Sequence, residues 1–228
     1  MSDLRTVTPD ALLGRDKVDL DIPDVAKAYA GRVVMITGAG GSIGSELCRQ
    51  LIGTSPARIV LFERSELALY HIDRELRPIA QAAGIGVTAR LGSVTDARRV
   101  TEVLQETGTE IVLHAAAYKH VPLVEENELE GVRNNVFGTQ VVAEAAQVAG
   151  VERFILISTD KAVRPTNIMG ATKRMAELVV QDLQTRSTYT KFSMVRFGNV
   201  LGSSSSVLPL FKQQIRRGGP VTVTDPDV

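Results

Sequence analysis

The sequence has little cysteine, no net charge and no long hydrophobic run, and each absence excludes a class of protein. Cys48 is the single cysteine in 228 residues, so no internal disulfide can form, and the chain fits a reducing compartment. The chain has 26 lysine and arginine residues and 26 aspartate and glutamate residues, so its formal net charge is zero. A zero net charge argues against binding to nucleic acid or anionic lipid by overall electrostatic attraction. No hydrophobic run approaches the roughly 18 residues that cross a bilayer, and the first thirty residues lack the order of a signal peptide. We therefore expect a cytoplasmic chain that makes no nucleic-acid or membrane contact.

Metal-ligand spacing is absent as well. The three histidines, His71, His114 and His120, are scattered, and one cysteine adds little, so no metal site is expected. Hydrophobic residues make up 44% and charged residues 23%, which is close to average globular usage and excludes disorder and low complexity. One large domain, or one domain with an appendage, is expected at this length.

Short apolar runs alternate with amphipathic stretches between residues 31 and 198. The runs predict strands over 33–37, 58–62, 86–91, 111–114, 154–158 and 192–196. The stretches between them predict helices over 42–52, 65–82, 96–106, 131–149 and 168–185. This alternation favours an α/β fold with a doubly wound parallel sheet, the Rossmann architecture.

The two ends of the chain differ from this pattern. Residues 1–30 are acidic and are interpreted as an N-terminal arm or linker, with a short helical hint over 10–13. Residues 199–228 are interpreted as the start of a C-terminal substrate-binding region, with a helical stretch over 208–217 and a strand-like VTVT near the end. We expect that this partial region continues beyond residue 228 in the natural protein.

The motif TGAGGSIG places three glycines directly after the first predicted strand. Gly38 permits a tight turn, Gly41 lets the backbone approach a pyrophosphate, and Gly44 allows the helix to pack closely on the strand. Ser42 and Ile43 lie at the start of the helix, where backbone N–H groups and the helix dipole favour phosphate. The motif in this setting predicts a dinucleotide-binding site.

The second predicted strand ends beside a carboxylate. Glu63 follows Gly44 by nineteen residues, near the expected spacing for a side chain that binds both ribose hydroxyls, which favours NAD. Arg64 could instead hold the 2′-phosphate of NADP, which we keep as the less favoured cofactor. A solvated charge pair at the end of a strand is the alternative without function.

Small residues end the fourth predicted strand in the motif HAAAY. Ala115, Ala116 and Ala117 would let the nicotinamide ribose lie against the backbone, although small residues there can equally serve packing. In the helix predicted over 168–185, Met169 and Lys173 are four residues apart and share one face. A lysine at that position could hold nicotinamide-ribose hydroxyls and lower the pKa of nearby groups by its charge.

Polar residues follow the fifth predicted strand in the sequence STDKAV. Ser158, Thr159, Asp160 and Lys161 emerge at the carboxyl end of that strand, where open α/β sheets bind their ligands. These residue types suit acid–base chemistry. A surface salt bridge between Asp160 and Lys161 would explain the pair nearly as well from spacing alone.

Six motifs in this order carry a family resemblance: TGAGGSIG, HAAAYKHVPLVE, NNVFGT, STDKAV, NIMGATKR and VRFGNVLGSS. Over about residues 12–228 the chain resembles the extended short-chain dehydrogenase/reductase superfamily. More narrowly, it resembles the UDP-N-acetylglucosamine 4,6-dehydratases of bacterial polysaccharide biosynthesis. The resemblance implies an NAD-dependent lyase that takes hydride from C4 of the sugar, eliminates water across C5 and C6, and returns the hydride to C6.

The resemblance also implies roles for individual residues. Asp160 would be the acid at the C6 hydroxyl, Lys161 the base at C5, and Thr159 would hydrogen-bond the C4 oxygen. Asp160 must then hold a proton near neutrality and Lys161 must be able to lose one, and burial favours both. The charge of Lys173 would favour neutral Lys161 but oppose protonation of Asp160, so burial has to dominate at Asp160.

Several positions depart from the family pattern or extend it. Met169 stands where the superfamily usually has a tyrosine base, as in a branch whose similar members retain configuration at C5. Ser93 stands where an aspartate commonly contacts adenine, with Val94 beside it, and Ser205 replaces a usual glycine. The resemblance further suggests substrate contacts for three residues, of which Asn199 could equally cap a turn: Lys119, His120 and Asn199.

Two other functions stay open on the same motifs. One is a nucleotide-sugar epimerase or reductase, against which Met169 argues, and the other is an NAD-binding module without turnover of its own. The segment PDALLGRDKVDLD resembles the connector to an N-terminal membrane domain in long family members. On that expectation the chain is the soluble part of an enzyme tethered at the inner face of the membrane. We expect a UDP-sugar as partner and a homo-oligomer whose size the sequence does not give.

Overall fold

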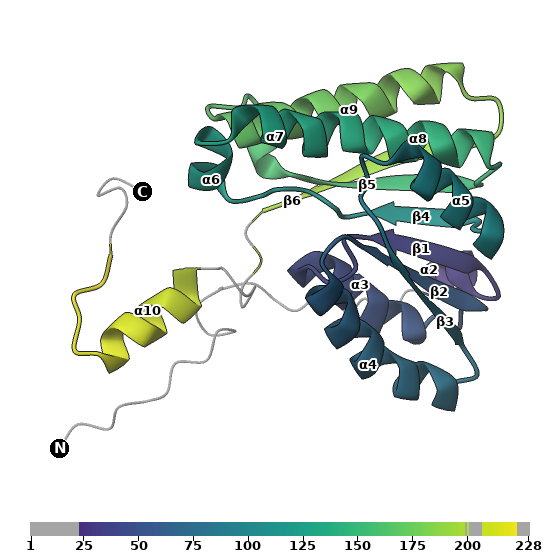
Figure 1. Ribbon diagram of the computed structural model, residues 1–228, viewed down its shortest axis with the longest axis horizontal. Coiled ribbons are helices and arrows are strands. Elements are labelled where there is room, and N and C mark those ends of the chain that lie inside the picture. The colour runs from purple at the N-terminus through teal and green to yellow at the C-terminus, as the bar shows by residue number, and fades with distance from the viewer. Residues whose placement is uncertain (1–22, 199, 201–206, 223–228) are drawn as a thin grey trace. The chain divides into compact units, whose positions relative to one another are not determined.

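Residues 23–198, 200 and 207–222 are described by the computed structural model of this chain. Parallel strands form one six-stranded sheet in the order β3-β2-β1-β4-β5-β6 (Figure 1). The strands are β1 (Val33–Thr37), β2 (Arg58–Glu63), β3 (Gly86–Leu91), β4 (Ile111–His114), β5 (Arg153–Thr159) and β6 (Lys191–Phe197). Each predicted strand is present to within one residue at either end, which confirms the doubly wound α/β fold. The order reverses between β1 and β4, where such sheets open a crevice for ligands.

Helices cover both faces of the sheet because successive side chains of a strand point to opposite sides. Val34 and Ile36 of β1 pack into a cluster beneath α3 (Ser42–Ile52) and α4 (Glu66–Ala82). Met35, between them, packs into the opposite cluster with α5 (Ala97–Thr107), α8 (Gly138–Val148) and α9 (Ile168–Arg186). Figure 1 shows these two helix layers on either side of the strands. Cys48 is buried in the first layer, which agrees with a role in packing.

Local sequence explains where the main helices begin. The side chains of Ser65, Asp96 and Asn167 accept the N–H of a residue three positions later, at 3.3, 3.0 and 2.7 Å. These are N-cap interactions, which satisfy backbone donors that the first turn leaves without a partner. Ser65 and Asp96 were predicted as the first helical residues and are the caps instead.

The predicted single helix over 131–149 is wrong in detail. The chain there forms α7 (Glu128–Val132), the π-helical segment η1 (Arg133–Phe137) and then α8. Two further short helices were not predicted, α6 (Val121–Glu125) and α2 (Pro23–Tyr29), the second of which falls within the range interpreted as a linker. A widened helical turn comes from a shifted hydrogen-bonding pattern, which hydrophobic spacing does not encode.

Beyond Gly198 the described residues form a separate unit, which contains the helix α10 (Val207–Arg216) near its predicted position. No strand is seen at residues 221 and 222. The predictions for the helical hint over 10–13, for Asn199 and for Ser205 lie outside the described residues.

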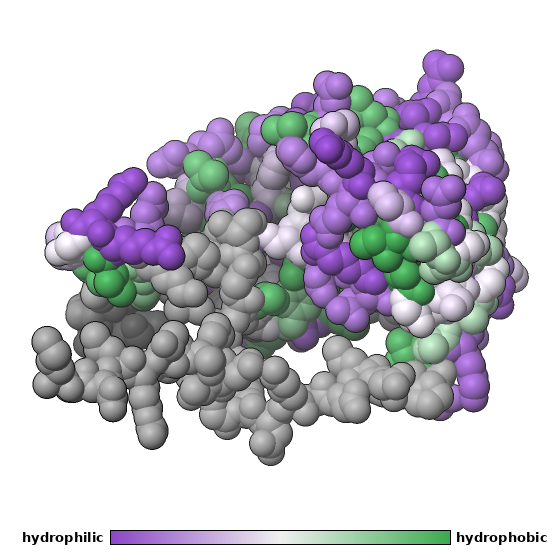
Figure 2. All heavy atoms as spheres, turned by 90° about the horizontal axis from the view of Figure 1, so that it is seen from below, coloured by the Kyte–Doolittle hydropathy of each residue, from purple (hydrophilic) through white to green (hydrophobic). Residues whose placement is uncertain are grey.

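Within the described part of the chain, no helix combines the length and apolar character needed to span a membrane. Figure 2 shows a surface on which hydrophobic residues form small, separate patches among hydrophilic ones.

Candidate active site

The turn between β1 and α3 brings backbone atoms too close together for side chains to fit. Gly38 has a φ of +67°, and a Cβ built on it would lie 2.8 Å from the Cα of Ala116. A Cβ on Gly44 would lie 2.0 Å from the carbonyl oxygen of Gly38. Gly41 precedes α3 and provides no side-chain cap, so the positive end of the helix dipole faces the turn. The turn therefore has the construction of an anion-binding loop.

Glu63 lies at the end of β2 with its carboxylate held beside the glycine turn. One carboxylate oxygen accepts the N–H of Gly40 at 3.1 Å. The other accepts the N–H groups of Arg64 and Ser65 at 2.9 and 3.0 Å. These backbone donors fix the orientation of the carboxylate, and its remaining lone pairs can accept further hydrogen bonds.

Arg64 is directed at an aromatic residue that sequence reasoning missed. Its guanidinium donates a hydrogen bond to the hydroxyl of Tyr118 and lies 5.8 Å from the centre of the ring. Tyr118 follows β4, so the contact joins the carboxyl ends of two strands that are separated by β1. The guanidinium thus has a partner other than a phosphate, which weakens the NADP interpretation.

Three adjoining hollows bring most of the predicted cofactor residues together. The first, of about 510 Å³, is lined by Gly38, Gly41, Glu63, Arg64, Val94, Ala115, Ala116, Ala117, Tyr118 and Asn134, among others. The second, of about 490 Å³, shares Gly41, Ala115, Ala117 and Tyr118 and adds Ser42, Ile43, Gly44, Lys119 and His120. The third, of about 620 Å³, shares Arg64 and Asn134 and adds Ser93. All three open along the carboxyl ends of β1, β2, β3 and β4.

The segment after β4 is held by a residue of the π-helical turn. Asn135 accepts the N–H of Tyr118 at 2.8 Å and donates to its carbonyl oxygen at 2.9 Å, which fixes the backbone there on both sides. The same amide donates to the hydroxyl of Thr172 on α9 at 3.0 Å. Asn135 was not singled out from the sequence, although it lies in the motif NNVFGT. It links the floor of the first hollow to the helix that carries Met169.

A buried histidine supports the same segment from below. The hydroxyl of Thr37 accepts the N–H of Ala116 at 3.3 Å and lies 2.7 Å from Nδ1 of His114. Nε2 of His114 lies 3.1 Å from the hydroxyl of Thr139, which donates to the carbonyl oxygen of Asn135. This chain of donors assigns the proton of the neutral ring to Nε2. Burial and the charge of Lys173 lower the pKa of His114 to about 3.

We expect the stability of the protein to fall as the pH drops below about 6.5. Unfolded His114 binds a proton near its ordinary pKa of 6.5 and the folded residue does so only near 3. Its stabilising contribution is therefore complete above 6.5 and is lost as the pH falls toward 3. The free energy of unfolding should decrease by about 1.4 kcal/mol between pH 7.5 and 5.5, as measured by urea denaturation.

The matched variants for this test are His114→Gln and His71→Gln. His71 is exposed on α4, so its replacement should keep the pH dependence of the wild type. His114→Gln should remove that dependence and lower stability at neutral pH. An equal slope in His114→Gln and the wild type would assign the dependence to other groups.

Thr159, Asp160 and Lys161 form a tight polar group where β5 ends in a short 3₁₀ turn, η2 (Asp160–Ala162). The Thr159 hydroxyl donates to one oxygen of Asp160 at 2.9 Å, and Nζ of Lys161 lies 3.3 Å from the same oxygen. The side chains of Thr159 and Lys161, both predicted as catalytic, thus contact the carboxylate of Asp160. None of them lines the three hollows described above.

Asp160 differs from the sequence-based expectation that burial dominates its protonation. Its side chain is 56% exposed. Burial acts to raise the pKa of Asp160, but hydrogen bonds from Thr159 and Lys161 outweigh it and hold the pKa below its usual range. Asp160 is therefore ionised beside Lys161, and burial does not dominate at this carboxyl group as the role of acid would require.

Met169 and Lys173 lie on the buried side of α9. Nζ of Lys173 donates to the carbonyl oxygen of Ile157, two residues before Thr159, at 2.7 Å. Burial lowers the pKa of Lys173 to about 8, although the charge of Glu177 partly opposes it. Lys173 therefore supports β5 from beneath, and neither residue lines the three hollows.

Gly170 is a further residue that the sequence did not single out. A Cβ built on it would lie 2.4 Å from the carbonyl oxygen of Lys161, so α9 and the η2 turn touch through backbone atoms. Glycine is the residue that permits such an approach. Its place in the motif NIMGATKR was the available signal.

The glycine turn and the Thr159–Lys161 group lie at one edge of the sheet. Because β5 neighbours β4 and β4 neighbours β1, their carboxyl ends are two strand spacings apart. At about 4.8 Å for each spacing, the ends of β1 and β5 are roughly 10 Å from one another. This separation suits one extended ligand, or two ligands in contact, across the β1–β4 crevice.

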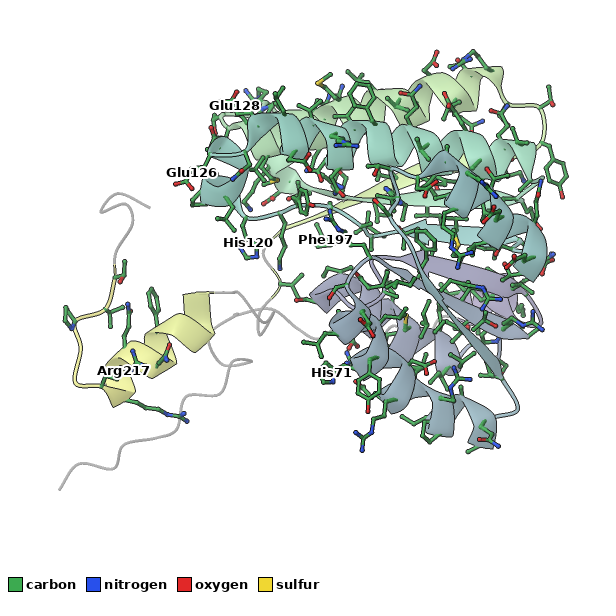
Figure 3. The ribbon with its side chains drawn as sticks, in the orientation of Figure 1. His71, His120, Glu126, Glu128, Phe197 and Arg217 are labelled. Atoms are coloured by element: carbon green, nitrogen blue, oxygen red, sulfur yellow. The ribbon has the colours of Figure 1, made fainter. Side chains whose placement is uncertain are left out.

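Lys119 and His120 lie beside this edge, just before α6. Figure 3 shows His120 at the same end of the sheet as Phe197, the last residue of β6, whereas His71 lies on α4. Residues 125–130, which contain four glutamates, are all exposed, and Figure 3 shows Glu126 and Glu128 on the outside beside α6 and α7. Among the described residues, no group of His, Cys, Asp and Glu could hold a metal ion.

Comparison with known proteins identifies the family. A model of the family described as "Polysaccharide biosynthesis protein" matches residues 34–228. The chain belongs to this family. The result confirms the resemblance to a polysaccharide-biosynthesis family that the six motifs carry.

Several proteins of known name are similar to this chain, and each of them is longer than this chain. The "Capsular polysaccharide biosynthesis protein CapD" of Staphylococcus aureus is 47% identical over 100% of this chain and 38% of the relative. A "UDP-N-acetylglucosamine 4,6-dehydratase (inverting)" of Campylobacter jejuni is 34% identical over 86% of this chain and 58% of the relative. UDP-glucose 4-epimerases of Rickettsia are 31% to 32% identical. The chain spans about two fifths to three fifths of the length of these relatives.

A solved structure is also similar to this chain in sequence and in fold. The protein Pen from Bacillus thuringiensis is 34% identical, with a TM-score of 0.79 over 86% of this chain and 61% of that one. The relatives thus include nucleotide-sugar dehydratases and epimerases, built on a fold that this chain shares.

Proposed function

We propose that this chain is the cofactor-binding and catalytic part of a nucleotide-sugar 4,6-dehydratase that acts on UDP-N-acetylglucosamine. The observation that carries the proposal is the pair of groups at one edge of the sheet. The glycine turn with Glu63 suits a dinucleotide, and the contacting group of Thr159, Asp160 and Lys161 lies two strands away. The similarity to the Campylobacter jejuni enzyme supports the choice of substrate.

The residues of the first hollow fit NAD. Gly41 and the uncapped start of α3 would receive the pyrophosphate, and the oriented carboxylate of Glu63 would accept the ribose hydroxyls. Ala115 to Ala117 offer a floor of small residues toward β5, where a nicotinamide would face the sugar. When bound, NAD would supply reversible hydride transfer, from C4 of the sugar and back to C6.

The chain's own residues would carry out the proton transfers. Thr159 would donate a hydrogen bond to the C4 oxygen, and the proton of the C4 hydroxyl would pass to a water. Lys161 would remove the C5 proton, Asp160 would protonate the departing C6 hydroxyl, and Lys161 would return a proton to C5 as the hydride reaches C6. Met169 cannot accept a proton, so the superfamily's usual tyrosine chemistry has no equivalent here. The family's epimerase chemistry is disfavoured for the same reason.

The contact between Asp160 and Lys161 accounts for the protonation states that these roles need. In this structure Asp160 is ionised, and the side chains of Asp160 and Lys161 are both partly exposed. Movement of one proton from the ammonium to the carboxylate gives a neutral acid and a neutral amine. A bound sugar that excludes water favours this neutral pair, because desolvation disfavours both charged forms. Substrate binding would thus prepare both catalytic groups together.

The proposal is tested with UDP-N-acetylglucosamine deuterated at C4. The chain is incubated with NAD and this substrate, and the product is examined by mass spectrometry and NMR. We expect loss of water, a ketone at C4 and deuterium at C6, since the hydride removed from C4 returns within the same molecule. The NMR spectrum also gives the configuration at C5, for which the branch with methionine at position 169 leads us to expect retention.

Other outcomes would assign a different function. A product of unchanged mass with inverted configuration at one sugar carbon would identify an epimerase. Binding of NAD without turnover would identify a cofactor-binding module and would end the claim of catalysis by this chain.

A further inference from the structure

A fully buried carboxylate lies directly behind the catalytic group. Glu177 on α9 has no exposed surface and contacts three side chains, which with it we call the Glu177 cluster: Ser158, Arg174, Arg196 and Glu177. The four residues come from β5, α9 and β6. Neither the cofactor site nor the proposed proton transfers use any of them.

From these contacts we infer that Glu177 is a positioning residue, which fixes the end of β5 and thereby the Thr159–Asp160–Lys161 group. The inference rests on the proposed function for the identity of that group. Ser158 immediately precedes Thr159, and its buried hydroxyl donates to Glu177 at 2.6 Å. The last side chain of β5 before the catalytic residues is therefore tied to α9.

Arg196 connects Glu177 to β6 as well. Its Nε and one terminal nitrogen bind the two oxygens of Glu177 at 2.7 and 2.6 Å, a bidentate geometry that fixes the orientation of both groups. Ser158 and Arg196 are also directly paired in the parallel register of β5 and β6. One carboxylate thus holds two neighbouring strands at the same level.

The Glu177 cluster is connected to the Thr159–Asp160–Lys161 group through the ends of β5 and β6. On β5, Lys173 binds the carbonyl oxygen of Ile157, so consecutive turns of α9 hold consecutive residues. On β6, a Cβ built on Gly198 would lie 3.4 Å from a carboxylate oxygen of Asp160, so the strand end borders the catalytic carboxylate. A shift of β5 would move Thr159, Asp160 and Lys161 together, and a shift of β6 would change the surroundings of the Asp160 carboxylate.

Glu177 itself is unsuited to proton transfer. Burial acts to raise its pKa, but hydrogen bonds from Arg196, Ser158 and Arg174 outweigh it and lower the pKa to about 2. The group stays ionised through the physiological range. Its contribution is a fixed charge with four donors, which suits orientation.

The test uses Ser158→Ala and Glu177→Gln, with Glu144→Gln as control. Ser158→Ala removes only the hydroxyl that links β5 to Glu177, and it leaves the Arg196 pair in place. Glu144 is an exposed glutamate on α8. For dehydration we expect kcat to fall by about 10- to 100-fold in both cluster variants, because small displacements of reacting groups and loss of their supporting hydrogen bonds cost rates of this order. KM for the UDP-sugar and the affinity for NAD should stay within about twofold, since neither Ser158 nor Glu177 contacts either ligand in the proposed site.

A second readout is independent of turnover. Amide hydrogen exchange in Ser158→Ala should accelerate over residues 159–161 and stay unchanged over β1, and Glu144→Gln should match the wild type at both places. If the wild type fails to dehydrate the sugar, the proposed function is lost while this exchange measurement still decides the positioning role. Wild-type exchange over 159–161 in Ser158→Ala would overturn the inference, as would an unchanged kcat. Should Glu177→Gln fail to fold, Ser158→Ala decides alone.

Discussion

Replacement of Gly44 by alanine should eliminate NAD binding, at concentrations of NAD that saturate the wild type. The added Cβ would lie 2.0 Å from the carbonyl oxygen of Gly38, and backbone on both sides cannot yield as a flexible side chain would. Either α3 moves away from β1 or the turn opens, and both displace the N–H groups proposed to hold the pyrophosphate. Overpacking of this kind also costs about 1 to 3 kcal/mol of stability. Isothermal titration calorimetry with NAD and thermal denaturation measure the two effects.

Gly53→Ala is the matched control for this prediction. Gly53 follows the other end of the same helix with a φ of −65°, and a Cβ there would make an ordinary contact at 3.5 Å. We expect this variant to bind NAD as the wild type does. Equal affinity in the Gly44 and Gly53 variants would show that the glycine turn does not form the cofactor site.

The second large effect is expected from Lys161→Ala. Loss of the proposed base at C5 should reduce the dehydration rate by about 10²- to 10⁴-fold, the usual contribution of a positioned general base. The affinity for NAD should change by less than twofold, because Lys161 lines none of the three hollows that contain the glycine turn. Initial rates of keto-sugar formation and calorimetric titration with NAD separate the two quantities.

Lys191→Ala provides a lysine control for the same experiment. Lys191 is exposed at the start of β6, at the edge of the sheet opposite to the catalytic group. Its replacement should leave the rate unchanged. Normal turnover in Lys161→Ala would remove this lysine from the mechanism, whereas a loss of NAD binding would show that it serves the cofactor instead.

The central strands β1, β2 and β4 could be located from the sequence to within a residue because they are buried on both faces. Runs such as VVMIT and IVLF therefore appear as unbroken apolar segments between polar residues. The π-helical turn at η1 and the short helices α2 and α6 could not be located in this way. They depend on local backbone hydrogen bonding and on packing against the rest of the fold.

Some residues of the candidate site could be predicted from the sequence and others could not. Glycines with a fixed spacing, and polar residues at strand ends, could be found because their roles follow from position along the chain. Asn135 and Gly170 escaped notice because their partners, Tyr118 and Lys161, are brought near only by the fold. Glu177 left a clearer signal. It follows Lys173 by four residues, on the buried stripe of α9, where a charge requires compensating partners.

The π-helical turn allows one helical segment to serve two separate parts of the site. Three consecutive residues of η1, Asn134, Asn135 and Val136, are all buried, which is more inward-facing surface than successive positions of a regular α-helix present. Asn134 therefore borders the first hollow while its neighbour Asn135 fixes the loop after β4. A shortening by one residue here would restore regular winding at the expense of one of these two functions.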